Sequence, residues 1–137
     1  NDEHITPLLI RHAIESEYTV KFDVGYLLSF AIKQKPSFFI RGLVCHETPL
    51  MLTNLKEAIQ SILDFDQPSL IQYLLHSIQT VCDQCNVMNI LDQLFITFHE
   101  ETDILEHIYQ LKDNENEIIS KLAIDILQYF EEFRNPE

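Results

Sequence analysis

The chain contains very little glycine, few prolines and no tryptophan. Its 137 residues include 2 Gly and 5 Pro, and 46% of them are hydrophobic. β-Sandwiches need frequent turn residues, so a chain this poor in glycine is not expected to form one. The isolated Gly25 and Gly42 also cannot form the glycine-rich loop that cradles a phosphate. The composition therefore predicts an all-α fold without a phosphate-binding loop.

Motifs for catalysis and for metal binding are absent as well. The six histidines are dispersed, and none falls in a nucleophile, metalloprotease or phosphate-loop motif. Cys82 and Cys85 form a single C-x-x-C pair, but a thioredoxin-type site needs that pair at the start of a helix after a strand. A zinc site needs two further ligands, for which Cys45 and His46 are the only compact candidates. We interpret the thiols as structural and predict no enzyme activity, no cofactor and no metal site.

Nothing in the sequence points to secretion or to a membrane. Three cysteines, an odd number without a signal-like stretch, favour a reduced intracellular protein. No apolar run approaches the roughly 18 residues that a membrane span requires. The chain starts at Asn1 without a methionine, and we expect it to be a piece of a longer protein.

Basic residues are scarce, which restricts the class of partner. Nine Lys and Arg stand against 22 Asp and Glu, for a net charge of -13. Such a field repels nucleic acid and anionic membranes and attracts basic peptides or proteins. Eleven of the acidic residues and three of the basic ones lie from Glu100 onward. The alternatives for this acidic end are a solvated outer face and a docking surface for a basic partner, with the candidates Glu106, Glu115, Glu117, Glu131 and Glu132.

Apolar sequence with helical spacing is abundant. In the last segment the large apolar residues recur in steps of three and four, which places them on one side of a helix: Ile119, Leu122, Ile126, Phe130 and Phe133. The pattern predicts short helices over 5–14, 55–64 and 103–112, each followed after a polar break by a long helix, ending near Gln34, Asp83 and Phe133. Two further short segments, 37–51 and 88–100, precede the second and third of these pairs. Pro7 is interpreted as a first-turn proline and Thr53 or Asn54 as a helix cap.

The order short helix, short helix, long helix, in units of about 40 to 50 residues, is the armadillo order rather than the two-helix tetratricopeptide or ankyrin order. A unit of this kind cannot bury its apolar face alone, so neighbouring units must stack. We therefore expect one domain over 1–137, a right-handed α-solenoid of about three armadillo-type repeats. A partial repeat would cover 1–34, a repeat 35–85, and a terminal repeat 86–137.

The C-terminal stretch E-N-E-I-I-S-K-L-A-I-D-I-L-Q-Y-F resembles the closing repeat of the importin-α nuclear-import adaptors. The matching positions are Glu117, Ile118, Lys121, Ile126, Tyr129 and Phe130. The resemblance extends upstream through N-L-K-E-A-I-Q-S-I-L and I-T-P-L-L-I, and it is weakest between Lys33 and Thr53.

This resemblance implies a protein-binding scaffold of nuclear import, present in cytoplasm and nucleus. Its implied partners are proteins: cargo carrying a nuclear-localisation signal, an importin-β-like carrier, and the export receptor that recycles the adaptor. No nucleic acid and no membrane are expected among the partners. The alternative is a helical-repeat subunit that holds another complex together without binding cargo signals.

The resemblance also implies a peptide-binding site. In the family, long third helices carry a Trp and, one turn later, an Asn; the amides hold an extended peptide and the indoles form slots for lysine stems. The positions that look similar here are Asp23, Tyr26 and Phe30 on the first long helix and His76 and Thr80 on the second. Since Trp is absent, we expect a fragment that binds basic nuclear-localisation peptides only weakly.

The aromatic residues of the first long helix allow two interpretations. Phe22, Tyr26 and Phe30 are spaced four apart, beside a stripe of smaller apolar residues. Such a line can form slots for Lys or Arg through stacking and cation-π contact. It can equally be one edge of a broad core face.

Overall fold

The computed structural model describes residues 2–15, 18–44, 52 and 54–134. Within these residues the fold is all-α, as predicted, with nine α-helices, one π-helix and no strand. The helices are α1 (Asp2–Glu15), α2 (Tyr18–Gln34), α3 (Pro36–Val44), α4 (Leu55–Asp64), α5 (Pro68–Val87), α6 (Leu91–Phe95), η2 (Ile96–Glu100), α7 (Ile104–Leu111), α8 (Glu117–Tyr129) and α9 (Glu131–Arg134).

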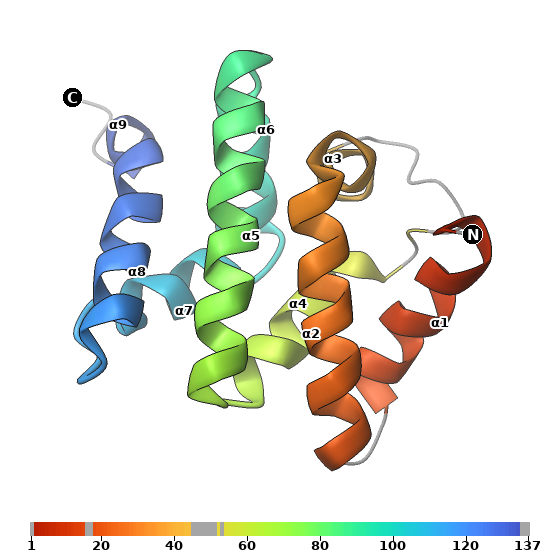
Figure 1. The fold of residues 1–137 in the computed structure, drawn as a ribbon. Helices are drawn as coiled ribbons and strands as arrows, with labels where there is room; N and C mark the ends of the chain where they lie inside the picture. The colour runs from red at the N-terminus through yellow and green to blue at the C-terminus, as the bar shows by residue number, and fades with distance from the viewer. Residues whose placement is uncertain (1, 16–17, 45–51, 53, 135–137) are drawn as a thin grey trace.

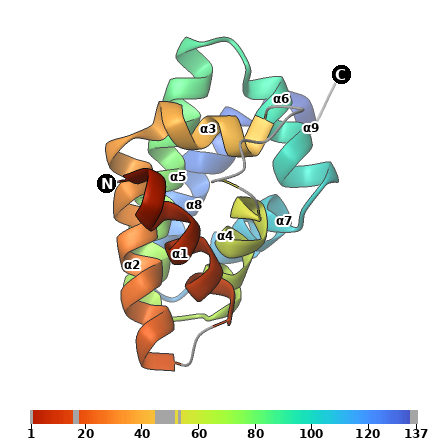
Figure 2. The same cartoon turned by 90° about the vertical axis from the view of Figure 1, so that its right-hand side faces the viewer.

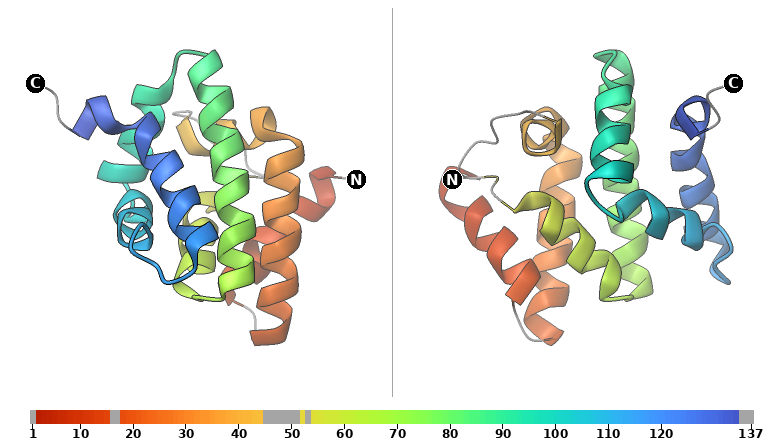
Figure 3. Two further views of the ribbon diagram at one scale, coloured as in Figure 1. Left: turned by 60° about the vertical axis from the view of Figure 1, so that its left-hand side comes forward. Right: turned by 180° about the vertical axis from the view of Figure 1, so that it is seen from behind.

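The helices form two layers. The long helices α2, α5 and α8 lie side by side, with α5 packed against both neighbours (Figure 1). Helices α1, α4 and α7 lie behind them and contact one another in the same order, as the view from behind shows (Figure 3). The short helices α3 and α6 pack across one end of α5. The layers enclose a single elongated apolar core.

Gly25 permits the close contact between α2 and α5. A Cβ atom at this position would lie 2.9 Å from Cδ2 of Leu70, which is closer than real carbon atoms approach. A buried hydrogen bond from the Ser77 hydroxyl to the Ser29 carbonyl joins the same two helices one turn further on. The relative position of the first two long helices is therefore fixed by close packing and by a buried polar contact.

The burial predicted for the last long helix is confirmed. Four of the five apolar residues of its stripe are buried, namely Ile119, Leu122, Ile126 and Phe130. Phe133 is half-buried and stacks on Phe95, with ring centroids 5.5 Å apart. The predicted end of this helix near Phe133 is nevertheless wrong, because α8 covers Glu117–Tyr129 and a break at Phe130 separates it from α9.

One local prediction at the start of a helix is wrong, and another is confirmed in position alone. Pro7 lies inside α1, which begins at Asp2, so the missing N–H of this proline removes an intrahelical hydrogen bond near the helix start. Asn54 occupies the predicted cap position of α4, where its carbonyl accepts a hydrogen bond from the Ala58 N–H, but its backbone is left-handed, with φ of 67°, and its side chain makes no capping hydrogen bond. Thr53 and residues 45–51 lie outside the described part of the chain.

Predicted helix ends elsewhere are shifted by a few residues. Helix α5 continues to Val87 instead of ending at Asp83, and the segment predicted as 88–100 divides into α6 and the π-helix η2. Within residues 2–15, 18–44 and 54–134, no helix combines the length and apolar character needed to cross a membrane.

Candidate functional site

The exposed side of the α2, α5 and α8 layer carries the residues that the sequence singles out for peptide binding. On α2, Asp23, Tyr26 and Phe30 are exposed, whereas Leu28 and Ile32 of the same helix are buried in the core. On α5, His76 and Thr80 are half-buried. We call this surface the long-helix face.

The aromatic rings of α2 continue onto α5. Phe22 stacks on Tyr26, with ring centroids 6.4 Å apart and an angle of 28° between the rings. Tyr26 in turn contacts Tyr73 of α5, with centroids 4.2 Å apart at 35°. The aromatic line therefore lies on the surface and bridges two neighbouring helices. Phe30, one turn beyond Tyr26, extends it along α2.

Tyr73 was not singled out in the sequence, although a signal for it exists. The tripeptide Tyr-Leu-Leu occurs twice, at Tyr26 on α2 and at Tyr73 on α5. Aligning the two long helices on this tripeptide would have paired the two tyrosines. The structure brings their rings into direct contact.

The polar groups predicted on α5 are partly engaged within that helix. The Thr80 hydroxyl donates a hydrogen bond to the His76 carbonyl oxygen at 3.1 Å. Bonds of this type from Thr to the preceding turn are common and satisfy the hydroxyl locally. Asp83, one turn beyond Thr80, accepts a hydrogen bond from the Tyr129 hydroxyl of α8. Side chains of the long-helix face therefore connect α2 to α5, through Tyr26 and Tyr73, and α5 to α8, through Asp83 and Tyr129.

The long-helix face combines aromatic rings with carboxylates. Asp23 is exposed beside the rings of α2, and Asp83 is exposed on α5. On α8, the Asp125 carboxylate forms an ion pair with Lys121 at 3.3 Å. A Lys or Arg side chain suits such a surface, because its stem packs on a ring face while its charge approaches a carboxylate.

The five acidic docking candidates are all exposed, but they do not form one patch. Glu115 and Glu117 lie at the start of α8, whereas Glu131 and Glu132 lie on α9 beyond its other end. At 1.5 Å rise per residue, the 13 residues of α8 separate the two groups by about 20 Å. Glu106 is in the first turn of α7. A partner would have to span α8 to contact both groups.

An open hollow borders the second acidic group. It has a volume of about 600 Å³ and is lined by Asn86, Leu91, Gln128, Tyr129, Glu131 and Glu132. Both glutamates are exposed at its rim. The hollow adds a concave surface to this end of the molecule.

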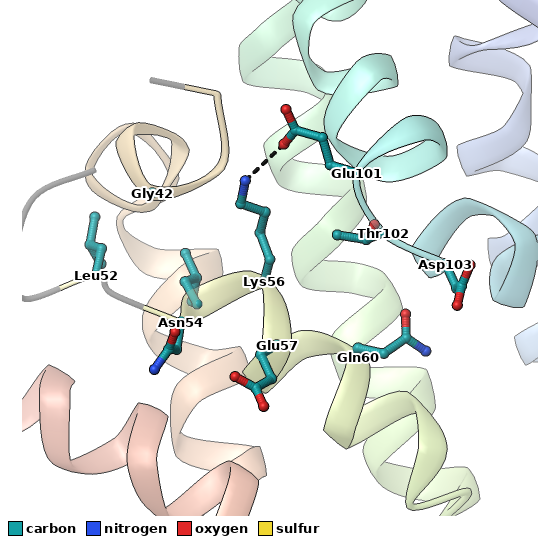
Figure 4. Close-up of a pocket in the computed structure, with 10 residues that line it drawn as sticks. Gly42, Leu52, Asn54, Lys56, Glu57, Gln60, Glu101, Thr102 and Asp103 are labelled. Atoms are coloured by element: carbon teal, nitrogen blue, oxygen red, sulfur yellow. Dashed lines mark hydrogen bonds and ion pairs between the residues drawn. The ribbon is translucent and has the colours of Figure 1, made fainter. Parts of the chain in front are cut away.

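A second hollow, of about 530 Å³, lies between α3, α4 and the segment before α7 (Figure 4). The Lys56 ammonium and the Glu101 carboxylate form an ion pair across it at 2.8 Å. Gly42, Leu52 and Leu55 contribute its apolar wall. This ion pair connects α4 to the segment before α7. It also offsets the positive charge of Lys56.

The C-x-x-C pair is buried in the core. The pKa of Cys82 is raised well above 9.0, mainly by burial and to a smaller extent by the nearby Cys85 and Asp83. Burial also raises the pKa of Cys85 from 9.0 to about 11. Protonated, inaccessible thiols are poor nucleophiles and poor metal ligands. Cys45 and His46 lie outside the described residues, and within the part of the chain that the structure describes no group of three His, Cys, Asp or Glu side chains could hold a metal ion.

No family model, curated protein or solved structure matches the chain. The feature with the clearest chemistry is the long-helix face, which presents an aromatic line, exposed at Tyr26, beside the exposed carboxylate of Asp23. That arrangement can contact a Lys or Arg side chain through its rings and its carboxylate.

Proposed function

We propose that the chain is an armadillo-type scaffold of nuclear protein import whose long-helix face binds an extended basic segment of a partner protein. The observation that carries this proposal is the aromatic line from Phe22 through Tyr26 to Tyr73, in which Tyr26 is exposed and the two outer rings are half-buried, with the exposed Asp23 beside it. The face is acidic and aromatic, and basic nuclear-localisation peptides have the complementary chemistry.

The grouping of the helices supports the armadillo part of the proposal. Helices α1 and α2 fall in 1–34, α3 and α4 in 35–85, and α6 to α9 in 86–137, whereas α5 lies mainly in 35–85 and crosses the second boundary to end at Val87. The long helix of each group belongs to the front layer and the helix before it to the rear layer (Figure 1). An array built from such units would be a right-handed solenoid.

In the proposed complex, lysine or arginine stems lie on the rings of Tyr26 and Tyr73, and the charge of one side chain approaches Asp23. A cation-π contact at an exposed site contributes about 0.5–1 kcal/mol. Phe30 offers no hydrogen-bonding group and the Thr80 hydroxyl is engaged within its own helix, so neither can hold a peptide backbone as a pair of amides would. Weak binding follows.

Phe30 and Thr80, which cannot hold a peptide backbone, favour a second candidate function. A face without backbone clamps suits a scaffold subunit that holds protein partners through its other surfaces and does not bind cargo signals. In either case the two acidic groups, at Glu115 with Glu117 and at Glu131 with Glu132, are the proposed docking points for basic regions of an importin-β-like carrier or an export receptor.

Fluorescence anisotropy with a labelled lysine-rich peptide tests the first candidate. We expect weak, salt-sensitive binding that Asp23→Lys or Tyr26→Ala reduces by about two- to fivefold, as expected for loss of one exposed cation-π or charge contact. A peptide with its lysines replaced by norleucine should not bind. Asp92→Lys changes an exposed carboxylate on α6 and is the matched charge control.

The outcomes separate the two candidates. Micromolar binding that survives both Asp23→Lys and Tyr26→Ala would place the peptide elsewhere on the molecule. Equal losses with Asp92→Lys would mean that only the net charge matters. No binding to any basic peptide, with folded protein, would favour the scaffold without cargo recognition.

A further inference from the structure

The outward side of α2 presents an aromatic ring and a carboxylate next to each other. Tyr26 precedes the buried Leu28 by two residues, about 200° around the helix, so it projects away from the core. In Figure 2, α2 runs along one edge of the molecule and the rear-layer helices α1, α4 and α7 all lie to one side of it. The ring of Tyr26 is 40% exposed, and Asp23 is exposed in the preceding turn.

Tyr73 closes one side of the Tyr26 ring. The two ring centroids lie 4.2 Å apart, and a third group between the rings would need about 3.5 Å of separation from each of them. The accessible part of the Tyr26 ring is therefore the side away from α5. Asp23 lies on that same side, because it precedes Gly25, which faces Leu70 of α5, by two residues, about 200° around the helix.

Lysines of the chain itself do not occupy this position. Within the part of the chain that the structure describes, Asp23 makes neither a hydrogen bond nor an ion pair. Lys21, two residues before it, instead donates a hydrogen bond to the Ser61 hydroxyl of α4 at 2.9 Å. The exposed Lys33 lies on the same side of α2 as Tyr26, about 10 Å further along the helix, and repels a second cation from that end. A partner's positive charge is therefore favoured at the Asp23 end.

We propose that Tyr26 and Asp23 together select an arginine of the partner in preference to a lysine. This inference rests on the proposed function and names the side chain that the long-helix face recognises. A guanidinium is planar and weakly hydrated, so it can lie flat on the Tyr26 ring while its edge donates two hydrogen bonds to the Asp23 carboxylate. Residues three apart on a helix have Cβ atoms about 5–6 Å apart, which brings both groups within reach of one guanidinium. A lysine ammonium is a strongly hydrated point charge without such a planar edge.

Fluorescence anisotropy with two labelled peptides tests the preference: the lysine-rich peptide, and the same peptide with every lysine replaced by arginine. The arginine peptide should bind the unaltered chain about three- to tenfold more tightly. Asp23→Asn and Tyr26→Leu should each reduce this ratio of affinities to less than about twofold, because the first removes the charge and the second removes the ring. Asp92→Asn on α6 and Tyr109→Leu on α7 change a carboxylate and a ring elsewhere, and both should leave the ratio unchanged.

The results distinguish this inference from the function on which it rests. Circular dichroism would check that every variant is folded. Equal affinity for the two peptides, with binding that Asp23→Asn still weakens, overturns the preference for arginine and leaves the proposed function intact. An arginine preference that persists in both Asp23→Asn and Tyr26→Leu overturns the assignment to these two residues. If neither peptide binds the folded chain, the proposed function fails and this inference fails with it.

Discussion

On α8, the burial of a side chain depends on the side of the helix from which it projects. Ile126 is fully buried, whereas Ile124, two residues earlier, is 43% exposed. The two side chains are chemically identical and belong to the same helix. Any difference in their contribution to stability therefore arises from packing, since their helix propensity is the same.

Truncation of these two isoleucines should have very different effects on stability. Ile126→Ala should lower the free energy of unfolding by about 2–5 kcal/mol, because it removes buried methyl groups and leaves a cavity. Ile124→Ala should change it by no more than about 0.5 kcal/mol. Urea unfolding followed by circular dichroism measures both. Equal losses at the two positions would contradict the packing of α8.

At the scale of single helices, the start of α8 is fixed by a side-chain cap. The Asn116 amide oxygen accepts hydrogen bonds from the backbone N–H groups of Ile118 and Ile119, at 2.9 and 3.2 Å. Asn114 similarly accepts from the Asn116 N–H. By contrast, the Asn54 side chain makes no such bond at the start of α4. Two asparagines that look equivalent in the sequence therefore have different roles.

Removing the cap of α8 should destabilise the protein. Asn116→Ala should cost about 1 kcal/mol of unfolding free energy, and Asn116→Ser should retain most of the stability because its hydroxyl can accept the same bonds. Asn54→Gly is the comparison at α4 and should cause no loss, since glycine adopts a positive φ freely. Thermal and urea unfolding would test all three. A larger loss at Asn54 than at Asn116 would contradict these assignments.

For the whole molecule, the uneven distribution of charge is the dominant electrostatic feature. The net charge of -13 belongs entirely to residues 45–137, and the described residues contain few compensating ion pairs, among them Lys56–Glu101 and Lys121–Asp125. Repulsion between exposed carboxylates opposes the compact state. It weakens when salt shortens the range of the interaction.

Added salt should therefore raise the thermal midpoint of unfolding. The rise should occur mainly between low and physiological ionic strength, where the screening length falls from about 30 to about 8 Å. Sodium chloride and potassium chloride should act alike, because screening depends on ionic strength and not on the identity of the cation. Differential scanning calorimetry would measure the shift. A midpoint that falls with salt would mean that attractive charge pairs outweigh the repulsion.

The spacing of apolar residues predicted most of the helical segments and the buried side of the last long helix. Large apolar residues spaced three and four apart occupy one side of any helix, whatever its neighbours are, so Ile119, Leu122 and Ile126 could be assigned to the core. The acidic character of the chain and the exposure of Glu117 and Glu131 follow from composition in the same direct way.

Which helices are neighbours, and which side each turns toward the next, became known from the folded structure alone. The contact of Tyr26 with Tyr73 and the bond from Tyr129 to Asp83 each join residues more than 40 positions apart, and no local periodicity specifies them. The separation of the acidic candidates by the length of α8 is likewise a property of the fold. Local pattern fixes the face that a helix buries, whereas the partners on that face depend on the packing of distant segments, which a periodicity of 3.6 residues does not encode.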